Sequence, residues 1–490
     1  MKKIMKKVLL TVAATLVSGA MSLAFAGAPA PATYKVLAWN DLGMHCACPT
    51  FEGFLLLPPF NTVRAQVLKY GGNDPTVMSA TSAATDKITI NYAMVENTDA
   101  NLKVDPYFAS WITNAPKLFP GFAPVNATGK IMGLGGYGLY GTMGYNSNLL
   151  AFEAVGIPAY PITTGNTAKD VMTDPLGGPK RDPYLTANVT VKNSAGATVA
   201  STSTVVPVAF GGCCSCHLQL AAANGYPATP AGSFAVLGLL HGRNSSGINI
   251  AQIDPDGDGV GGPVRCSWCH WDPAMGEASA PGWPAGTKLL AGATFTLKKS
   301  TMSFSDVLHR FHNQSALVKS TYDPNIATNC YKCHPGNGIQ CYRGVHVTKA
   351  STMFCMDCHG NLTQRTSTNQ LAQPWKMSTL PSCLGPSAGI TSAFACHSNK
   401  ITVYPASPAF AGAFINGRGH KGSMDCQACH GSPHAERPSS LAADNVGVAA
   451  ANSSVAGATY PAGVNSSYPL GVCKFCHPNK STVWQKPFHQ

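Results

Sequence analysis

The chain has 490 residues, of which only 11% are charged, and a formal net charge of +12. Its 49 Gly and 36 Pro are typical of a loop-rich protein, and its length suffices for two to four domains. After the N-terminal segment, no stretch approaches the roughly 20 apolar residues of a membrane-spanning helix, so we expect no transmembrane segment. The basic balance alone could indicate a nucleic-acid or anionic-lipid partner.

Residues 1–26 have the pattern of a secretory signal peptide. Lysines between Lys2 and Lys7 form a positive start, Val8 to Ala20 is apolar, and Ala24-Phe25-Ala26 is a small-residue cleavage signature. The mature protein is therefore expected to begin at Gly27, and an uncleaved anchor is the alternative. No cysteine follows closely, so a lipid anchor is not indicated. We expect a protein that is secreted through this signal.

The region 27–205 is rich in β-forming residues. Strands are predicted at Tyr34–Trp39, Lys87–Tyr92 and Asn188–Lys192. The last of these is followed by Thr198–Val205 across a short Gly-containing turn, which predicts a hairpin. Together these elements favour an N-terminal β-rich, sandwich-like domain.

The region 206–490 contains the pattern Cys-x-x-Cys-His six times. In c-type cytochromes the two thiols form thioether bonds to the haem vinyl groups, and the adjacent His binds the iron. Six copies in an exported chain favour haem c over zinc knuckles or disulfides. The copies are Cys213/Cys216/His217, Cys266/Cys269/His270, Cys330/Cys333/His334, Cys355/Cys358/His359, Cys426/Cys429/His430 and Cys473/Cys476/His477.

A seventh site is irregular, because Cys383 and Cys396-His397 are separated by twelve residues. A longer loop can still bring two thiols to the vinyl groups, and a disulfide beside an unrelated His is the alternative. The run Cys355-Met-Asp-Cys-His-Gly360, followed by Pro374-Trp375 and Pro381-Ser-Cys383, resembles one common in extracellular multihaem cytochromes. There a Cys-x-x-Cys-His normally follows, which implies an insertion here and a total of about seven haems.

Eight histidines remain as candidates for the second axial position of seven irons, which fits bis-His ligation with one to spare. His309 and His312 lie three residues apart in a predicted helix that starts near Ser303 or Ser305, so they share one face and could serve neighbouring haems. The distal candidates are His241, His309, His312, His346, His420 and His434, followed less securely by His45 and His489. The proximal ligands are the motif histidines His217, His270, His334, His359, His397, His430 and His477.

Two further features lie outside the haem motifs. The cysteines Cys46, Cys48, Cys214 and Cys341 are left over, and their pairing cannot be deduced from the sequence. The turn Asp254-Pro-Asp256-Gly-Asp258 places three carboxylates at alternate positions, which suits a Ca²⁺ loop. It is not an EF-hand, because its twelfth position is Arg265, and a plain acidic turn is the alternative.

The fold expected for 206–490 is a multihaem domain with sparse short helices at the Cys-x-x-Cys-His sites and mostly coil between them. The porphyrins would supply most of its buried apolar surface, and their propionates would offset the excess of Lys and Arg. The segment Trp39–Cys46 with Leu57–Val67 resembles an N-terminal segment of secreted bacterial multihaem proteins.

The whole pattern resembles the periplasmic and extracellular multihaem cytochromes of metal-respiring bacteria, some of which polymerise into filaments. The irregular motif is similar to that of an octahaem filament-forming cytochrome, although the haem distribution and the gap length differ. The resemblance implies electron transfer rather than catalysis, with redox proteins or extracellular acceptors as partners, self-assembly as an option and no nucleic acid. The alternative is a multihaem oxidoreductase with one open haem that acts on a small nitrogen or sulfur compound. The absence of a Cys-x-x-Cys-Lys motif disfavours that alternative.

Overall fold

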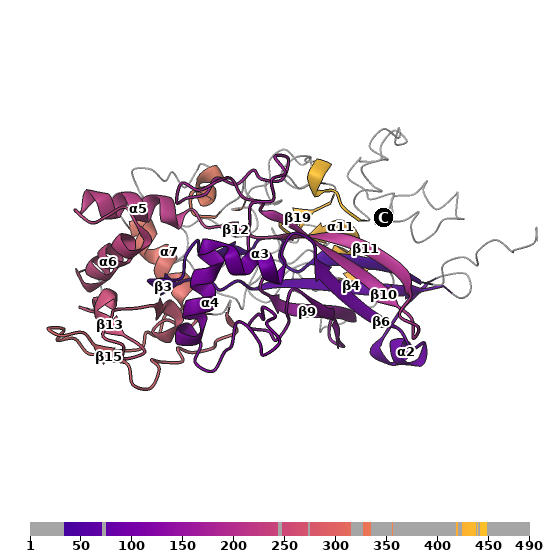
Figure 1. Ribbon diagram of the computed structural model, residues 1–490, viewed down its shortest axis with the longest axis horizontal. Coiled ribbons are helices and arrows are strands. Elements are labelled where there is room, and N and C mark those ends of the chain that lie inside the picture. Colours follow the sequence, from indigo (N-terminus) through magenta and orange to yellow (C-terminus); the bar gives the residue numbers. More distant parts are fainter. Residues whose placement is uncertain are drawn as a thin grey trace, which may run out of the picture.

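The computed structural model describes residues 34–70, 75–243, 247–272, 275–314, 327–334, 355, 418–419, 424–437, 439 and 442–447. This part of the chain is elongated, with two β-sheets at one end of its long axis and a group of helices at the other (Figure 1). Among these residues, no helix has the length and apolar character that crossing a membrane would require.

Two antiparallel sheets form the N-terminal region, as the sequence predicted. The first has the strand order β1-β4-β9-β8, with β5 beside β4, and the second has the order β11-β10-β6-β7. The strands of the first sheet are β1 Tyr34–Asn40, β4 Asn61–Lys69, β5 Thr76–Val77, β8 Gly144–Asn146 and β9 Ala151–Ile157. Those of the second are β6 Thr89–Met94, β7 Tyr140–Thr142, β10 Tyr184–Lys192 and β11 Thr198–Pro207.

The predicted hairpin is present as β10 and β11. Alternate residues of β10, among them Ala187, Val189 and Val191, are buried, which is the period expected of a strand with one face in the core. The turn closes on Asn193, whose side-chain oxygen accepts hydrogen bonds from the backbone of Ala195 and Ala197, both at 3.0 Å. Such Asx contacts stabilise tight turns.

One hydrophobic core joins the two sheets to short helices: α2 Ala80–Thr85, α3 Asp99–Val104 and α4 Pro106–Leu118. Helix α4 begins at Pro106 because Asp105 accepts hydrogen bonds from the first-turn amides of Tyr107 and Phe108, both at 3.0 Å. Its Trp111 is fully buried and packs edge-on against Phe51, with ring centres 5.0 Å apart. This core stabilises the strands that carry the next elements.

Two very short parallel pairings tie the N-terminal strands to the start of the haem motifs. Strand β2 Cys46–Ala47 pairs with β12 Ala209–Phe210, and β3 Phe54–Leu55 pairs with β14 Val264–Arg265. Strand β12 leads into Cys213 within three residues, and β14 leads directly into Cys266. A domain boundary was predicted near residue 205, and these pairings join the two sides of it.

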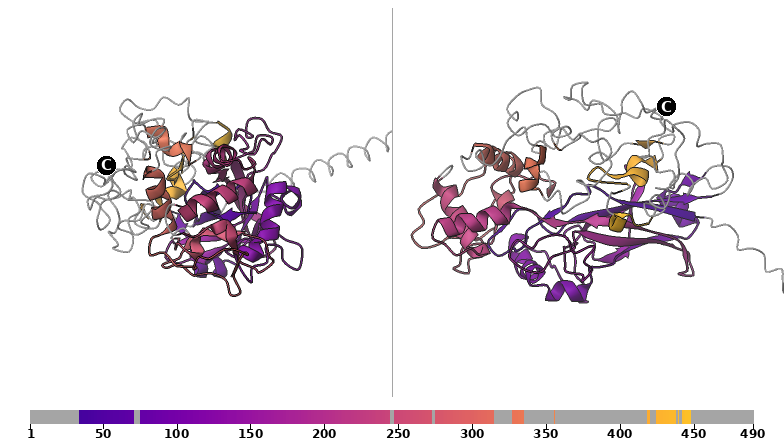
Figure 2. Two further views of the ribbon diagram at one scale, coloured as in Figure 1. Left: turned by 90° about the vertical axis from the view of Figure 1, so that its left-hand side faces the viewer. Right: turned by 90° about the horizontal axis from the view of Figure 1, so that it is seen from above.

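Most of the remaining elements lie beyond the sheets. Helices α5 Cys213–Ala223, α6 Pro230–His241 and α7 Phe304–Gln314 gather at the opposite end of the long axis (Figure 1). Helix α11 Cys426–His430 instead lies against the sheets (Figure 2, right). The other short elements are η2 Ile250–Gln252, β13 Ile253–Asp254, η3 Cys266–Trp268, β15 Lys288–Leu289, η5 Ala327–Lys332, β16 Arg418–Gly419, β17 Met424–Asp425, β18 Gly431–Ser432, β19 Ala435–Glu436 and η12 Ala442–Asp444.

Helix α11 packs on the face of the first sheet that points away from the main core. Leu37 and Trp39 of β1 form a second apolar cluster there with Ala428, and Cys429 packs against it. The backbone amide of Asp425 donates to the side-chain oxygen of Gln66 on β4, at 3.1 Å. The outer face of the sheet therefore supports one of the Cys-x-x-Cys-His motifs.

Candidate haem sites

Four of the predicted motifs fall largely within the described residues, and each coincides with a helical turn. These turns are the first turn of α5, the turn η3, the end of η5 and the helix α11. Cys355 of a fifth motif is also described. The predicted residues that lie outside the described part of the chain are Cys341, His346, Cys358, His359, Cys383, Cys396, His397, His420, Cys473, Cys476, His477 and His489.

The first and third motifs touch through their backbones. The amide of Gly212, just before Cys213, donates to the carbonyl oxygen of Cys333 at 2.9 Å. A Cβ on Gly212 would lie 2.1 Å from the carbonyl oxygen of Lys332, so only glycine allows this approach. The sites of Cys213–His217 and Cys330–His334 are therefore immediate neighbours.

Three motif histidines each lie opposite a predicted distal histidine. The ring centres of His217 and His312 are 6.4 Å apart, with an angle of 23° between the ring planes. For His334 and His309 the values are 6.2 Å and 14°. For His270 and His241 they are 6.5 Å and 69°.

These separations are those of two imidazoles on one metal ion. An imidazole nitrogen binds a first-row metal at roughly 2.0–2.1 Å, and the ring centre lies about 1.1 Å behind it. Two imidazoles on opposite sides of one ion thus have ring centres about 6.2–6.4 Å apart. The three observed values of 6.2–6.5 Å match this spacing, so the residues present fit a bis-His iron centre at each position.

The distal histidines are held in the orientation that ligation requires. In α7, Nδ1 of His309 donates to the carbonyl oxygen of Ser305 and Nδ1 of His312 to that of Leu308, each at 2.7 Å. Nδ1 of His241 donates to the Ile248 carbonyl at 2.9 Å. A donor bond at Nδ1 leaves the lone pair of Nε2 for a metal ion.

His434 has the same kind of anchor, from a distant part of the chain. It lies between β18 and β19, and its Nδ1 donates to the carbonyl oxygen of Leu42 at 2.9 Å. A Cβ on Gly43 would lie within 2.7 Å of Ala435 and closer still to Ser432, so the loop after β1 fits closely against this hairpin. The N-terminal region thus orients one predicted ligand.

A histidine must be neutral to bind a metal ion, and burial favours the neutral form of three motif histidines and of His309. Burial and the facing His312 together lower the pKa of His217 to about 4. Burial and the facing His334 lower the pKa of His309 to about 4. The pKa values of His270 and His334 are lowered by the same main cause.

Several motif thiols have raised pKa values, which favours their uncharged form. Burial raises the pKa of Cys213 and Cys266 well above the usual value. Cys330 has a raised pKa because it hydrogen-bonds the thiol of Cys355, which brings the third and fourth motifs together, and because it is buried. Outside the motif positions, Cys46, Cys48 and Cys214 are free thiols, so the structure assigns no pairing to these three.

The second cysteines of the first and third motifs differ from the first ones in exposure. Cys216 and Cys333 are exposed free thiols, whereas Cys213 and Cys330 are partly buried. Both cysteines of each motif were predicted to bind haem, and a thioether bond at each stays a prediction.

His45 has a different environment from the other candidates. Its Nε2 binds Oδ1 of Asp41 at 3.0 Å, and both side chains are largely buried. The Asp41 carboxyl is itself buried, which raises its pKa, but the His45 and Arg64 charges outweigh this effect and lower it. Within the described part, no second histidine ring lies opposite His45, and its role as a distal ligand stays a prediction.

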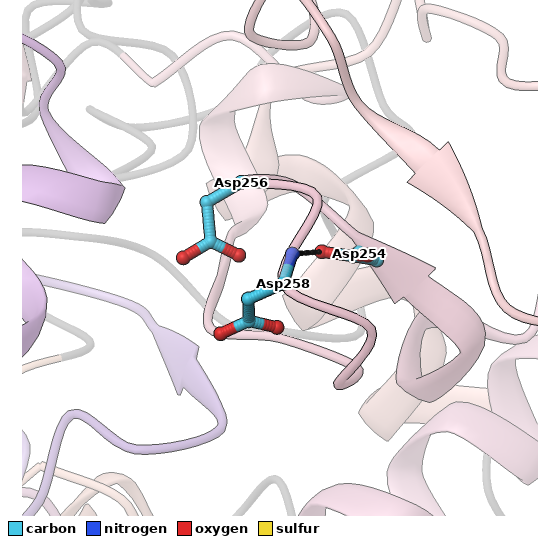
Figure 3. Close-up of side chains that lie close together, drawn as sticks. All are labelled: Asp254, Asp256 and Asp258. Atoms are coloured by element: carbon cyan, nitrogen blue, oxygen red, sulfur yellow. Dashed lines mark hydrogen bonds between the residues drawn. The ribbon is translucent and has the colours of Figure 1, made fainter.

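The three aspartates of the candidate calcium turn do lie together (Figure 3). Their ligand oxygens are within 4.8 Å of one another. However, Asp254 accepts hydrogen bonds from the amides of Gly257, Asp258 and Gly259, at 2.7, 3.1 and 2.9 Å. The ammonium of Lys117 binds Asp256 at 2.7 Å and Asp258 at 2.9 Å, and so already supplies a positive charge. These contacts account for the acidic turn without an ion, and calcium stays a prediction.

No family model, curated protein or solved structure matches this chain.

The sequence named the candidate ligands but not their partners. Which distal histidine faces which motif depends on how α6 and α7 pack, and no local pattern carries that information. The close contact at Gly212 and the anchor at Leu42 were not predicted either. The Gly-Gly pair directly before the first motif was the available sequence signal for the contact at Gly212. The anchor at Leu42 is a backbone carbonyl, which any residue has, so the sequence contains no signal for it.

Proposed function

We propose that this protein is an electron-transfer protein with about seven covalently bound c-type haems. The observation that carries the proposal is the set of three histidine pairs at 6.2–6.5 Å, each combining a motif histidine with a distal candidate. Histidine on both sides leaves an iron without an open position for substrate, which suits electron transfer. The haem would supply one-electron chemistry, and the protein sets spacing, ligation and polarity.

Helix α7 places two of these sites side by side. His309 and His312 lie one helical turn apart on the same helix and face His334 and His217. The hydrogen bond from Gly212 to Cys333 holds the two motifs together from the opposite side. Two sites fixed at this separation favour direct electron exchange between them.

The second site adjoins this pair, because helices α5 and α6 pack against each other. Helix α6 ends at His241, which faces His270, and α5 begins with the first motif. The described sites therefore form a contiguous group, as a chain of electron carriers requires. The buried aromatic and aliphatic residues of the N-terminal core give this group a rigid support.

Other parts of the proposal rest on the sequence. The signal pattern at 1–26 supports export to the periplasm or the cell surface, where redox proteins or extracellular acceptors would be the partners. The shared core of the two sheets supports a sandwich-like arrangement for the region before residue 205. The resemblance to multihaem cytochromes of metal-respiring bacteria supports respiration outside the cytoplasm, with filament assembly as an option.

A multihaem oxidoreductase with one open iron is the second candidate. The three sites with both sides described each present two histidines, which supports the electron-transfer proposal for these three. A reductase would show a high-spin iron in the resting protein.

Mass spectrometry and near-infrared magnetic circular dichroism of the purified protein test the proposal. We expect seven haem additions and a spectrum of bis-His, low-spin iron. Replacement His312→Ala should leave every haem attached and convert one iron to high spin. Arg310→Ala on the same helix, whose side chain is largely exposed, is the control and should change nothing. Absence of covalent haem, or an unchanged spectrum in H312A, contradicts the proposal.

A further inference from the structure

Arg437 is a buried cation that lacks a charged partner. Its side chain is 4% exposed, and it follows directly after β19. Nη2 donates to the carbonyl oxygen of Ala38 at 2.5 Å and to the hydroxyl of Thr204 at 2.9 Å. Both acceptors are neutral. No carboxylate among the described residues lies within ion-pair distance of this guanidinium, and its Nη1 has no hydrogen-bond partner.

An isolated buried cation is costly, so proteins pair such groups with an anion. Burial lowers the pKa of Arg437 to about 10, which is still far above neutral pH, so the guanidinium stays charged. The two other buried arginines among the described residues show the usual arrangement. Arg181 binds Asp105 at 2.7 Å and Asp174 at 2.9 Å, and Arg64 binds Glu153 at 3.2 Å. By comparison, Arg437 lacks an acidic group.

The location of Arg437 identifies the kind of anion. Its backbone amide donates to the carbonyl oxygen of His430 at 2.8 Å, and Cys429 is close enough to affect its pKa. Two more buried side chains along the contact between α11 and β1 have polar atoms without partners: Nε1 of Trp39 and both amide atoms of Gln427. Buried polar atoms that lack partners together indicate a missing polar ligand.

We propose that Arg437 binds a propionate carboxylate of one of the covalently attached haems. The inference rests on the proposed function and deepens it. Each haem c carries two carboxylates, and guanidinium binds carboxylate strongly through its fork of N–H donors. Ala38 and Thr204 hold Nη2 in place, which leaves Nη1 for the carboxylate. Arg437 thereby connects strands β1 and β11, through Ala38 and Thr204, to the haem.

Redox titration of the purified holoprotein tests the assignment. Loss of a positive charge beside a haem favours its ferric form, so Arg437→Gln should lower the midpoint potential of one haem while the haem count stays complete. Arg437→Lys, which keeps the charge, should retain most of the original potential. Lys103→Gln, at an exposed lysine of α3 in the N-terminal region, is the control and should leave all potentials unchanged.

Infrared difference spectra of the oxidised and reduced protein, with haem isotopically labelled at its propionates, give a second measurement. R437Q should shift the labelled carboxylate band, and R437K should shift it less. If R437Q folds poorly, R437K by itself tests the inference, because it should still shift the labelled propionate band. Unchanged bands and potentials in fully haem-loaded variants overturn the inference. A wild-type protein without covalent haem would instead refute the proposed function.

Discussion

The contact between the first and third motifs can be tested at a single atom. Gly212 has φ −67° and ψ −6°, which alanine adopts without strain. If no atom lay near the new Cβ, Gly212→Ala would therefore stabilise the protein by about 0.4–1 kcal/mol, because alanine lowers the conformational entropy of the unfolded chain. In this structure the new Cβ would lie 2.1 Å from the Lys332 carbonyl oxygen, and ordinary contact begins near 3.4 Å.

The two backbones would consequently have to separate by about 1.3 Å, which also breaks the hydrogen bond from Gly212 to Cys333. Backbone cannot move aside as a flexible side chain can. We therefore expect a loss of stability of about 1–3 kcal/mol, the range of overpacked sites. The neighbouring Gly211→Ala is the matched control, because its Cβ would meet nothing closer than 3.7 Å.

The assay is denaturant unfolding of both holoproteins, with the near-infrared spectrum recorded beside it. G212A should unfold at lower denaturant concentration than wild type, and G211A should not. If the two variants are equally stable, the first and third motifs are not packed as the structure has them, and the electronic contact proposed between their haems loses its basis.

Three further predictions concern pH, a helix cap and the leader. The free energy of unfolding should fall as the pH drops from about 6.5 towards about 4, because histidines of the unfolded chain then bind protons that buried His217 and His309 do not. Urea unfolding at a series of pH values measures this free energy, and a flat profile would argue against the burial of the two histidines. Asp425→Ala should destabilise α11 by about 1 kcal/mol, because Asp425 accepts a hydrogen bond from the Gln427 amide at 2.8 Å. The comparison is Asp306→Ala, on the partly exposed surface of α7, and equal losses of stability in thermal unfolding would count against the Asp425 cap. N-terminal sequencing of the exported protein should begin at Gly27, and a start at Met1 would show that the leader is retained.

The local sequence pattern was enough to predict the elements that are stabilised by contacts between neighbouring residues. The β10–β11 hairpin was predicted because its strands alternate and its turn has Asn193 and Gly196 at suitable positions. The helix around His309 was also predicted, and its start near Ser303 is confirmed, since the Ser303 hydroxyl accepts a hydrogen bond from the Asp306 amide at 3.1 Å. Each of these signals lies within about ten residues of sequence.

Features stabilised by distant contacts gave no such signal. Strands β2 and β3 have two residues each, too few to show a period of two, and they exist because β12 and β14 lie beside them. The pairing of His241 with His270 depends on the packing of α6, and no local pattern distinguishes Arg437 from the other arginines. Burial and partners define these sites, and both are tertiary properties.

The parallel pairings of β2 and β3 also bear on how the chain can fold. A chain is synthesised from its N-terminus, yet Cys46 pairs with Ala209 and Phe54 with Val264, far later in the sequence. Contacts between such distant positions are slow to form, because a long loop must close first. Strands β2 and β3 must therefore remain without these partners until the first two Cys-x-x-Cys-His motifs have been made. If haem binds there as proposed, its attachment and the completion of the N-terminal region are expected to be coupled in time. A fragment that ends before residue 209 would keep two strand edges open, which are sites for unwanted association.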